Sequence, residues 1–223
     1  MTAIGMMYFL SQWYFPPVIV YHKISESDLK SPYHLSPKNF VDQMYFLKAH
    51  QYHVLSLREL IAMIKQGKQI PKKSVVICIY GGWESNFVHA FPILKELDLT
   101  ATFFVRASDL GREGYLTLED LQILRENQLD IGLIADSREE FEMRRVLAPV
   151  AEEDLLIARM QDEIPISETD VYQYQLFGGI LMNSSVSGTS SSEFKIPSLD
   201  ILQNMNNLLL YWWALSGYAH YLD

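Results

Sequence analysis

Residues 73–105 read KSVVICIYGGWESNFVHAFPILKELDLTATFFV, and this stretch decides the fold. It begins with a short apolar, β-branched run at 75–79 and ends with a second buried-type run at 101–105. Between them, residues 84–97 carry apolar side chains at helical spacing. The pattern predicts a βαβ unit with two buried parallel strands. Such a unit presents its functional groups where its strands end, here at residues 80–84.

The flanking sequence continues this alternation of strands and helices. Ser36, Ser56 and Thr117 stand at N-cap positions, and Asp120 completes a capping box with Thr117. Gln51 follows the first helix where a left-handed residue is expected, at a cost in stability that glycine would avoid. Strands are predicted at 17–21, 52–55, 129–134 and 176–182, and helices at 37–50, 57–64, 118–127, 139–145, 151–163 and, after Ser198, 199–215.

Length and charge limit the kind of protein. A chain of 223 residues with 49% apolar residues suits one domain, taken as 17–223 behind an apolar segment at 1–16. The formal net charge of −9 argues against a nucleic-acid partner. Cys78, the one cysteine, lies in a predicted buried strand, so we expect an apolar core residue, with a nucleophile as the alternative.

Both ends of the chain are rich in aromatic residues. Residues 1–17 contain no Lys or Arg, so they form no clear signal peptide, and they are too short to span a membrane. They fit a docking strand or a trimmed anchor equally well. The apolar run 208–215 predicts a core helix, with contact to a membrane surface or a partner as the alternative.

Four motifs give the chain a family resemblance. Residues 101–105 read ATFFV, residues 21–24 read YHKI, residues 36–40 read SPKNF, and residues 78–82 read CIYGG. These resemble the ATFFV, YHxI, SPxxF and TFDDG motifs of polysaccharide deacetylases, the NodB-homology family. The resemblance is good over 17–137 and weak afterwards. It implies an α/β fold, a NodB-like irregular (β/α) barrel that is shortened or incomplete in its C-terminal half.

The resemblance also shows which functional positions differ. Tyr80 and Gly81 stand where the family has its catalytic-base and metal-binding aspartates, and Ile134 and Arg138 stand where it has two metal-binding histidines. Neither isoleucine nor a guanidinium can donate a lone pair to zinc. We therefore expect no catalytic residue and no bound metal, although the family uses a divalent metal such as zinc.

A degenerate pocket is expected at these positions. Tyr80 and Trp83 could stack on a sugar ring, with Glu84, Asn86 and Asp136 as hydrogen-bond partners; alternatively, Tyr80 plugs the former metal cavity. His22 follows the first strand and either lines this pocket or is a core histidine bonded to backbone. The expected pocket residues are His22, Tyr80, Gly81, Trp83, Glu84, Ile134, Asp136 and Arg138.

Three hypotheses for function follow. The first is a catalytically degenerate relative that binds a glycan or has a structural or regulatory role with a partner protein. The second is an active metal-dependent deacetylase of N-acetyl sugars with a rearranged site, a hydrolase of amide C–N bonds. The third is a decayed, non-functional fragment. A cell-envelope or extracellular location follows from the family by analogy alone.

Overall fold

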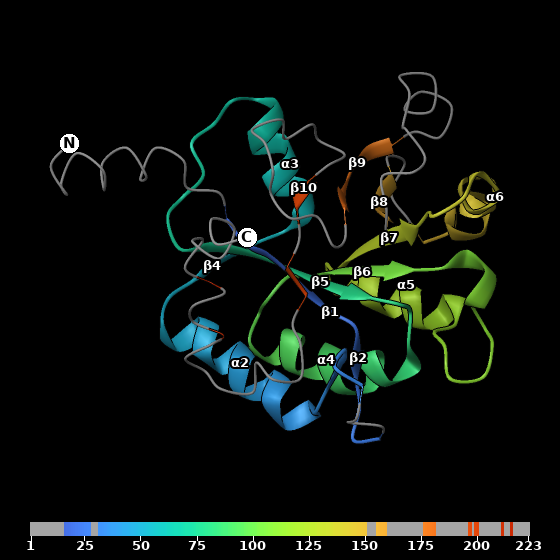
Figure 1. Ribbon diagram of the computed structural model, residues 1–223, viewed down its shortest axis with the longest axis horizontal. Helices are drawn as coiled ribbons and strands as arrows, with labels where there is room; N and C mark the ends of the chain where they lie inside the picture. The colour runs from blue at the N-terminus through green and yellow to red at the C-terminus, as the bar shows by residue number, and fades with distance from the viewer. Residues whose placement is uncertain are drawn as a thin grey trace, which may run out of the picture.

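The computed structural model describes residues 16–27, 31–150, 155–159, 176–181, 196–197, 199–200, 211 and 215. In this part of the chain a parallel sheet curls around a helix on its inner side, with further helices outside (Figure 1). The strands run in the order β10-β9-β8-β7-β6-β5-β1-β11, and β4 also pairs with β5. Their bounds are β1 Val18–Tyr21, β4 His53–Leu55, β5 Ser74–Tyr80, β6 Thr102–Val105, β7 Asp130–Ile134, β8 Leu155–Arg159, β9 Leu176–Leu181, β10 Ile196–Pro197 and β11 Leu199–Asp200.

The helices begin where the sequence places their caps. Ser36 accepts a hydrogen bond from the Asn39 backbone, and Ser56 and Thr117 form capping boxes, so all three predicted N-caps are confirmed. A short parallel pair, β2 Lys23–Ile24 and β3 His34–Leu35, lies outside the main sheet. The helices are α2 Pro37–Ala49, α3 Leu57–Lys65, α4 Glu84–Glu96, α5 Leu118–Glu126 and α6 Arg138–Glu142, with 3-10 turns at Ala107–Asp109 and Met143–Leu147.

One predicted helix is wrong, and a second is wrong where it begins. Residues 151–163 contain the strand β8, in which the run Leu155-Leu156-Ile157-Ala158 extends the sheet beside β7. The charged residues on either side of this run led to the prediction of a helix. Leu199–Asp200 is likewise a strand, β11, which pairs with β1. Tyr211 and Leu215 are helical, as that prediction expects, whereas residues 1–15, 201–210, 212–214 and 216–223 and Ser198 lie outside the described residues.

Each central strand is buried on both faces. The residues that alternate toward one face, such as Ile77 and Phe103, pack against buried side chains of α2, α4 and α5. Those that alternate toward the other face, such as Val76 and Phe104, pack against Leu57 of α3. Two-sided burial explains why these strands read as continuous apolar runs rather than as alternating patterns.

Residues near the two ends of the described chain contact each other at Tyr21 and Tyr211. The hydroxyl of Tyr21 in β1 lies 2.8 Å from Gln43 Oε1 of α2 and 3.2 Å from the hydroxyl of Tyr211. Burial raises the pKa of both phenols, so both stay protonated at neutral pH. No helix within the described residues is long and apolar enough to cross a membrane.

Gln51 has the left-handed backbone that the sequence predicts, with φ +56. We expect Gln51→Gly to raise the free energy of unfolding by about 1 kcal/mol, since glycine carries no Cβ penalty in this region. Urea unfolding would measure the change. Gln66→Gly is the matched control, because Gln66 ends α3 with φ −89 and should gain nothing. Equal gains at both positions would contradict the explanation.

Candidate functional site

The candidate site lies where β5 ends and α4 begins. Tyr80 closes the strand, and the next two residues, Gly81 and Gly82, turn the chain with φ +107 and +66. Both values favour glycine, because a Cβ is strained in this region. The turn is tied to its neighbours by Gly81 N, which donates to Phe104 O at 3.0 Å, and by Gly82 O, which accepts from Leu116 N at 2.9 Å.

Tyr80 faces the inner side of the sheet. It is half-buried and packs against the apolar cluster that contains Ile134, which is 1% exposed. Two of the positions at which this chain differs from the deacetylase motifs therefore contribute to one apolar surface. This packing is what the plug interpretation of Tyr80 expects.

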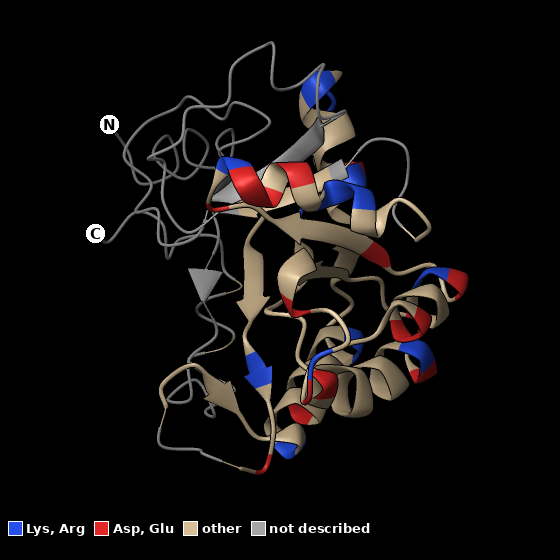
Figure 2. Ribbon diagram, turned by 90° about the vertical axis from the view of Figure 1, so that its right-hand side faces the viewer, with Lys and Arg blue, Asp and Glu red and all other residues tan. Residues whose placement is uncertain are grey.

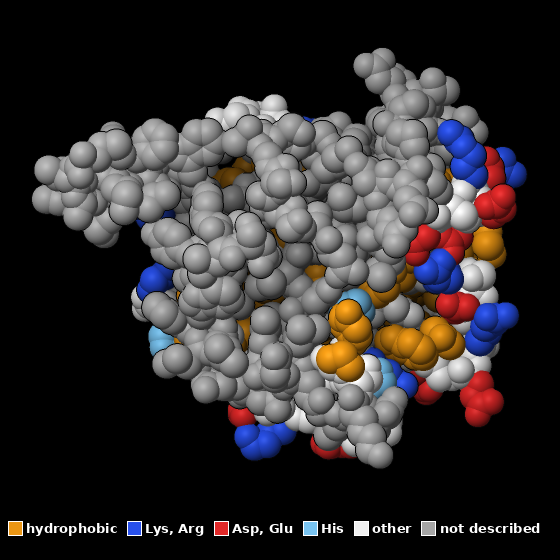
Figure 3. All heavy atoms as spheres, viewed as in Figure 1, with side chains coloured by type: hydrophobic (Ala, Val, Ile, Leu, Met, Phe, Trp, Pro, Cys, Tyr) orange, Lys and Arg blue, Asp and Glu red, His pale blue; other side chains and the backbone are white. Residues whose placement is uncertain are grey.

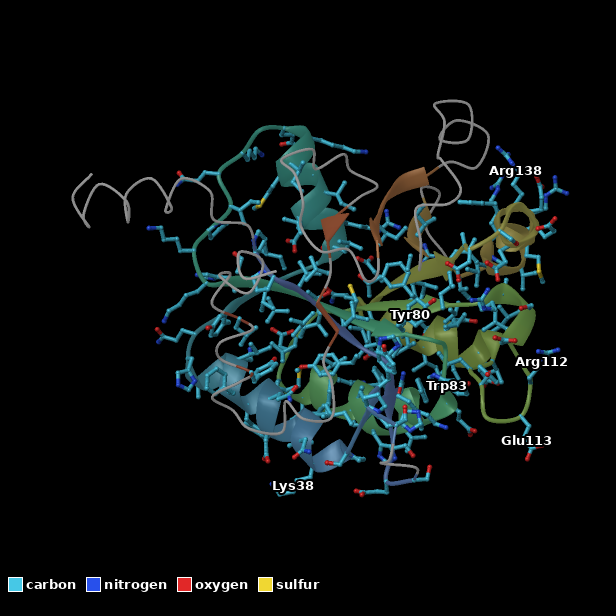
Figure 4. The ribbon with its side chains drawn as sticks, in the orientation of Figure 1. Lys38, Tyr80, Trp83, Arg112, Glu113 and Arg138 are labelled. Atoms are coloured by element: carbon cyan, nitrogen blue, oxygen red, sulfur yellow. The ribbon has the colours of Figure 1, made fainter. Side chains whose placement is uncertain are left out.

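Tyr80 and Trp83, both labelled in Figure 4, belong to a set of aromatic rings that come from four segments of the chain. The ring of His22 makes edge contacts with Tyr33 at 4.9 Å and with Tyr80 at 5.4 Å between centroids. The Trp83 ring stacks on Tyr115 at 4.5 Å. We call these five residues the aromatic rim; hydrophobic side chains beside histidine are visible on this face in Figure 3. Sequence reasoning missed Tyr33 and Tyr115, because each comes from a loop.

A buried amide holds part of the rim in place. Asn86 in α4 is fully buried; its Nδ2 donates to His22 O at 2.7 Å, and its Oδ1 accepts from Ile24 N at 2.8 Å. These two bonds fix the backbone on both sides of Lys23, whose Nζ lies 4.6 Å from the Trp83 ring. Asn86 is thus a positioning residue, which corrects its prediction as a hydrogen-bond partner for a ligand.

A charged cluster lies between the ends of β6 and β7. Arg106 binds Asp136 through Nη2 at 3.0 Å, also pairs with Glu140, and approaches Asp109 at 4.0 Å. Asp136 is therefore already paired with a cation rather than presented alone. No motif pointed to Arg106, although it directly follows β6. Acidic and basic residues are intermixed on the helices of this part of the molecule (Figure 2).

The expected pocket forms only in part. The structure brings His22, Tyr80, Gly81 and Trp83 together, with Glu84 exposed in the first turn of α4. Arg138 is exposed at the start of α6, and Figure 4 shows it at the edge of the molecule, away from Tyr80. Its side chain therefore lies apart from the residues gathered at Tyr80.

The described residues at this end of the sheet offer few groups that could bind a divalent metal. Within the described ranges, no three His, Cys, Asp or Glu side chains lie close enough to hold one. Burial, with a smaller contribution from Asp130, raises the pKa of the Cys78 thiol, which keeps it protonated as expected of a core residue.

Comparison with curated proteins finds polysaccharide deacetylases. The chain is 33% identical over 100 residues to the poly-β-1,6-N-acetyl-D-glucosamine N-deacetylase of Staphylococcus aureus strain MSSA476, a match that covers 45% of this chain and 34% of the relative. It is 29% identical over 116 residues to YxkH of Bacillus subtilis, named "Putative polysaccharide deacetylase", covering 52% and 40%. The chain thus spans less than half the length of these relatives, and no family model matches it.

Solved structures confirm the predicted NodB-like fold. The deacetylase PplD of Streptococcus pyogenes superposes with a TM-score of 0.71 at 19% identity, over 88% of this chain and 98% of that one. IcaB of Ammonifex degensii superposes with a TM-score of 0.69 at 18% identity, over 89% and 96%. The homologues and structural neighbours of this chain are therefore polysaccharide deacetylases.

Proposed function

We propose that this chain binds carbohydrate at the aromatic rim and does not catalyse deacetylation. The observation that carries the proposal is the rim itself, which gathers aromatic rings at the strand ends that hold the active sites of α/β barrels. Aromatic faces suit the apolar faces of sugar rings. Tyr33, with 43% of its surface exposed, offers the most open ring of the set.

Relatives suggest which sugars to test first. The Staphylococcus aureus relative is named for poly-β-1,6-N-acetyl-D-glucosamine, so a polymer of N-acetylglucosamine is the natural first ligand. Lys23 and the exposed carboxylate of Glu84 lie beside the rim and supply hydrogen-bonding groups for hydroxyl and amide substituents. Such glycans occur in cell envelopes, and a location there belongs to the same proposal.

The absence of catalysis is the second half of the proposal. A water-activating metal needs lone-pair donors, but Ile134 is buried in an apolar cluster, and Tyr80 covers that cluster. The donors in the described residues support a binding role over hydrolysis. An active deacetylase with a rearranged site is the competing function, and the experiment below separates the two.

We expect Tyr33→Ala to weaken binding of β-1,6-linked N-acetylglucosamine oligomers about tenfold in calorimetric titration, as removal of one stacking ring would. Tyr45→Ala is the matched control. Tyr45 has a similar exposed fraction, 46%, but lies on α2 and bonds to Glu96. Its loss should leave affinity unchanged.

The proposal has two parts, glycan binding and absence of catalysis, and one outcome would overturn each part. Undetectable binding of the oligomers by the wild-type chain would refute glycan binding at the rim. Release of acetate from the same oligomers, together with about one tightly bound metal per chain by elemental analysis, would refute the non-catalytic assignment and favour the deacetylase.

A further inference from the structure

We infer that Trp83 prevents position 81 from presenting a side chain at the site, because its indole fills the space where that side chain would lie. A Cβ built on Gly81 would stand 2.6 Å from Trp83 Nε1 and 2.9 Å from Trp83 Cδ1. Heavy atoms do not approach so closely without displacing one another. Position 81 therefore lacks room for any side chain while the indole keeps its place.

The indole is held from two separate segments. Tyr115 stacks on it with an interplanar angle of 26°, and the Lys23 ammonium lies over the ring at 4.6 Å. The backbones of the same two segments are also bonded: Trp83 forms a β-bridge with Tyr115, and Glu84 N donates to Gly114 O at 3.0 Å. Moving the indole away from Gly81 would break the stacking and the cation–π contact.

The position of the indole limits which side chains the end of β5 can present to a ligand. A carboxylate or imidazole introduced at position 81 must first displace the indole, so any ligating or acid–base group there requires a second change at Trp83. Trp83 acts as a positioning residue, since Tyr115 occupies one of its faces, and Tyr33 is the most exposed ring of the aromatic rim. The close approach of Trp83 to position 81 does not depend on whether a glycan binds.

Thermal unfolding of alanine variants in two backgrounds would test the inference. Gly81→Ala should lower Tm more than Gly67→Ala, both because φ +107 strains a Cβ more than φ +60 and because Gly67 has open space around a new Cβ. In a Trp83→Ala background, we expect the Tm loss from Gly81→Ala to shrink at least twofold. Gly82→Ala is the control in the same turn: its Cβ would meet Val105 at 3.3 Å, so its loss should be the same in both backgrounds.

An equal Tm loss from Gly81→Ala in both backgrounds would overturn the inference. If Trp83→Ala does not fold, Tyr115→Ala provides a second background that frees the indole without removing it. There the loss from Gly81→Ala should also shrink while that from Gly82→Ala stays constant, and an unchanged loss at Gly81 would again refute the role of Trp83.

Discussion

Asn86→Ala should lower the free energy of unfolding by about 3 kcal/mol, because it leaves two backbone groups without their partner in a desolvated place. The carbonyl of His22 loses a donor at 2.7 Å, and the amide of Ile24 loses an acceptor at 2.8 Å. Asn86 is itself fully buried, so water cannot easily replace it. Urea unfolding measured by far-UV circular dichroism would give the value.

A near-isosteric variant separates the two bonds of Asn86. Asn86→Asp keeps an acceptor for the Ile24 amide but has no donor for the His22 carbonyl when it is ionised. At neutral pH it also buries a charge beside that carbonyl, so we expect it to destabilise the fold as well. Protonation of the new carboxyl at low pH restores a donor, and the defect relative to wild type should then shrink. A loss well below 1 kcal/mol for Asn86→Ala would refute the positioning role.

Asp130→Ala should destabilise the protein by a similar amount, about 3 kcal/mol, because it removes the carboxylate from a mostly buried ion pair with Arg58. Arg58 Nε lies 3.2 Å from Asp130 Oδ1, and the two side chains are only 14% and 15% exposed. The pair joins α3, on the inner side of the sheet, to the first residue of β7. Equilibrium unfolding in urea would again measure the loss.

Two further variants test the cause. In Arg58→Met/Asp130→Leu, both charges are replaced by apolar groups, and we expect it to be more stable than Asp130→Ala alone. Asp42→Ala removes a carboxylate from the exposed Lys38–Asp42 pair, whose side chains are 79% and 45% exposed, and it should change stability little. If the double variant were less stable than Asp130→Ala, loss of charge pairing would not explain the destabilisation that Asp130→Ala causes.

The sequence predicts best those elements whose signal is local. Continuous apolar runs identify β5 and β6, and side-chain chemistry identifies the caps at Ser36 and Thr117. β8 was missed because its apolar run is only four residues long between charged ones, and β11 because a two-residue strand has no period to detect. Both are specified by neighbouring strands rather than by their own residues.

The site was predicted less completely for the same reason. Motif alignment placed Tyr80 and Ile134 at one end of the sheet, and the structure has them in one apolar cluster. Alignment carries no information on loop residues that approach from elsewhere, so it could not find Tyr33 or Tyr115. Nor could it show that both polar atoms of the Asn86 side chain form hydrogen bonds with backbone groups.

The pairing of β1 with β11 has a consequence for how the protein is made. β1 is translated well before β11, its neighbour on one side, and 190 residues before Tyr211, which bonds to Tyr21. Until those residues have emerged, β1 has one unpaired edge, the kind of surface that binds chaperones or other unfinished chains. This edge of the sheet therefore closes only after the central strands have been made.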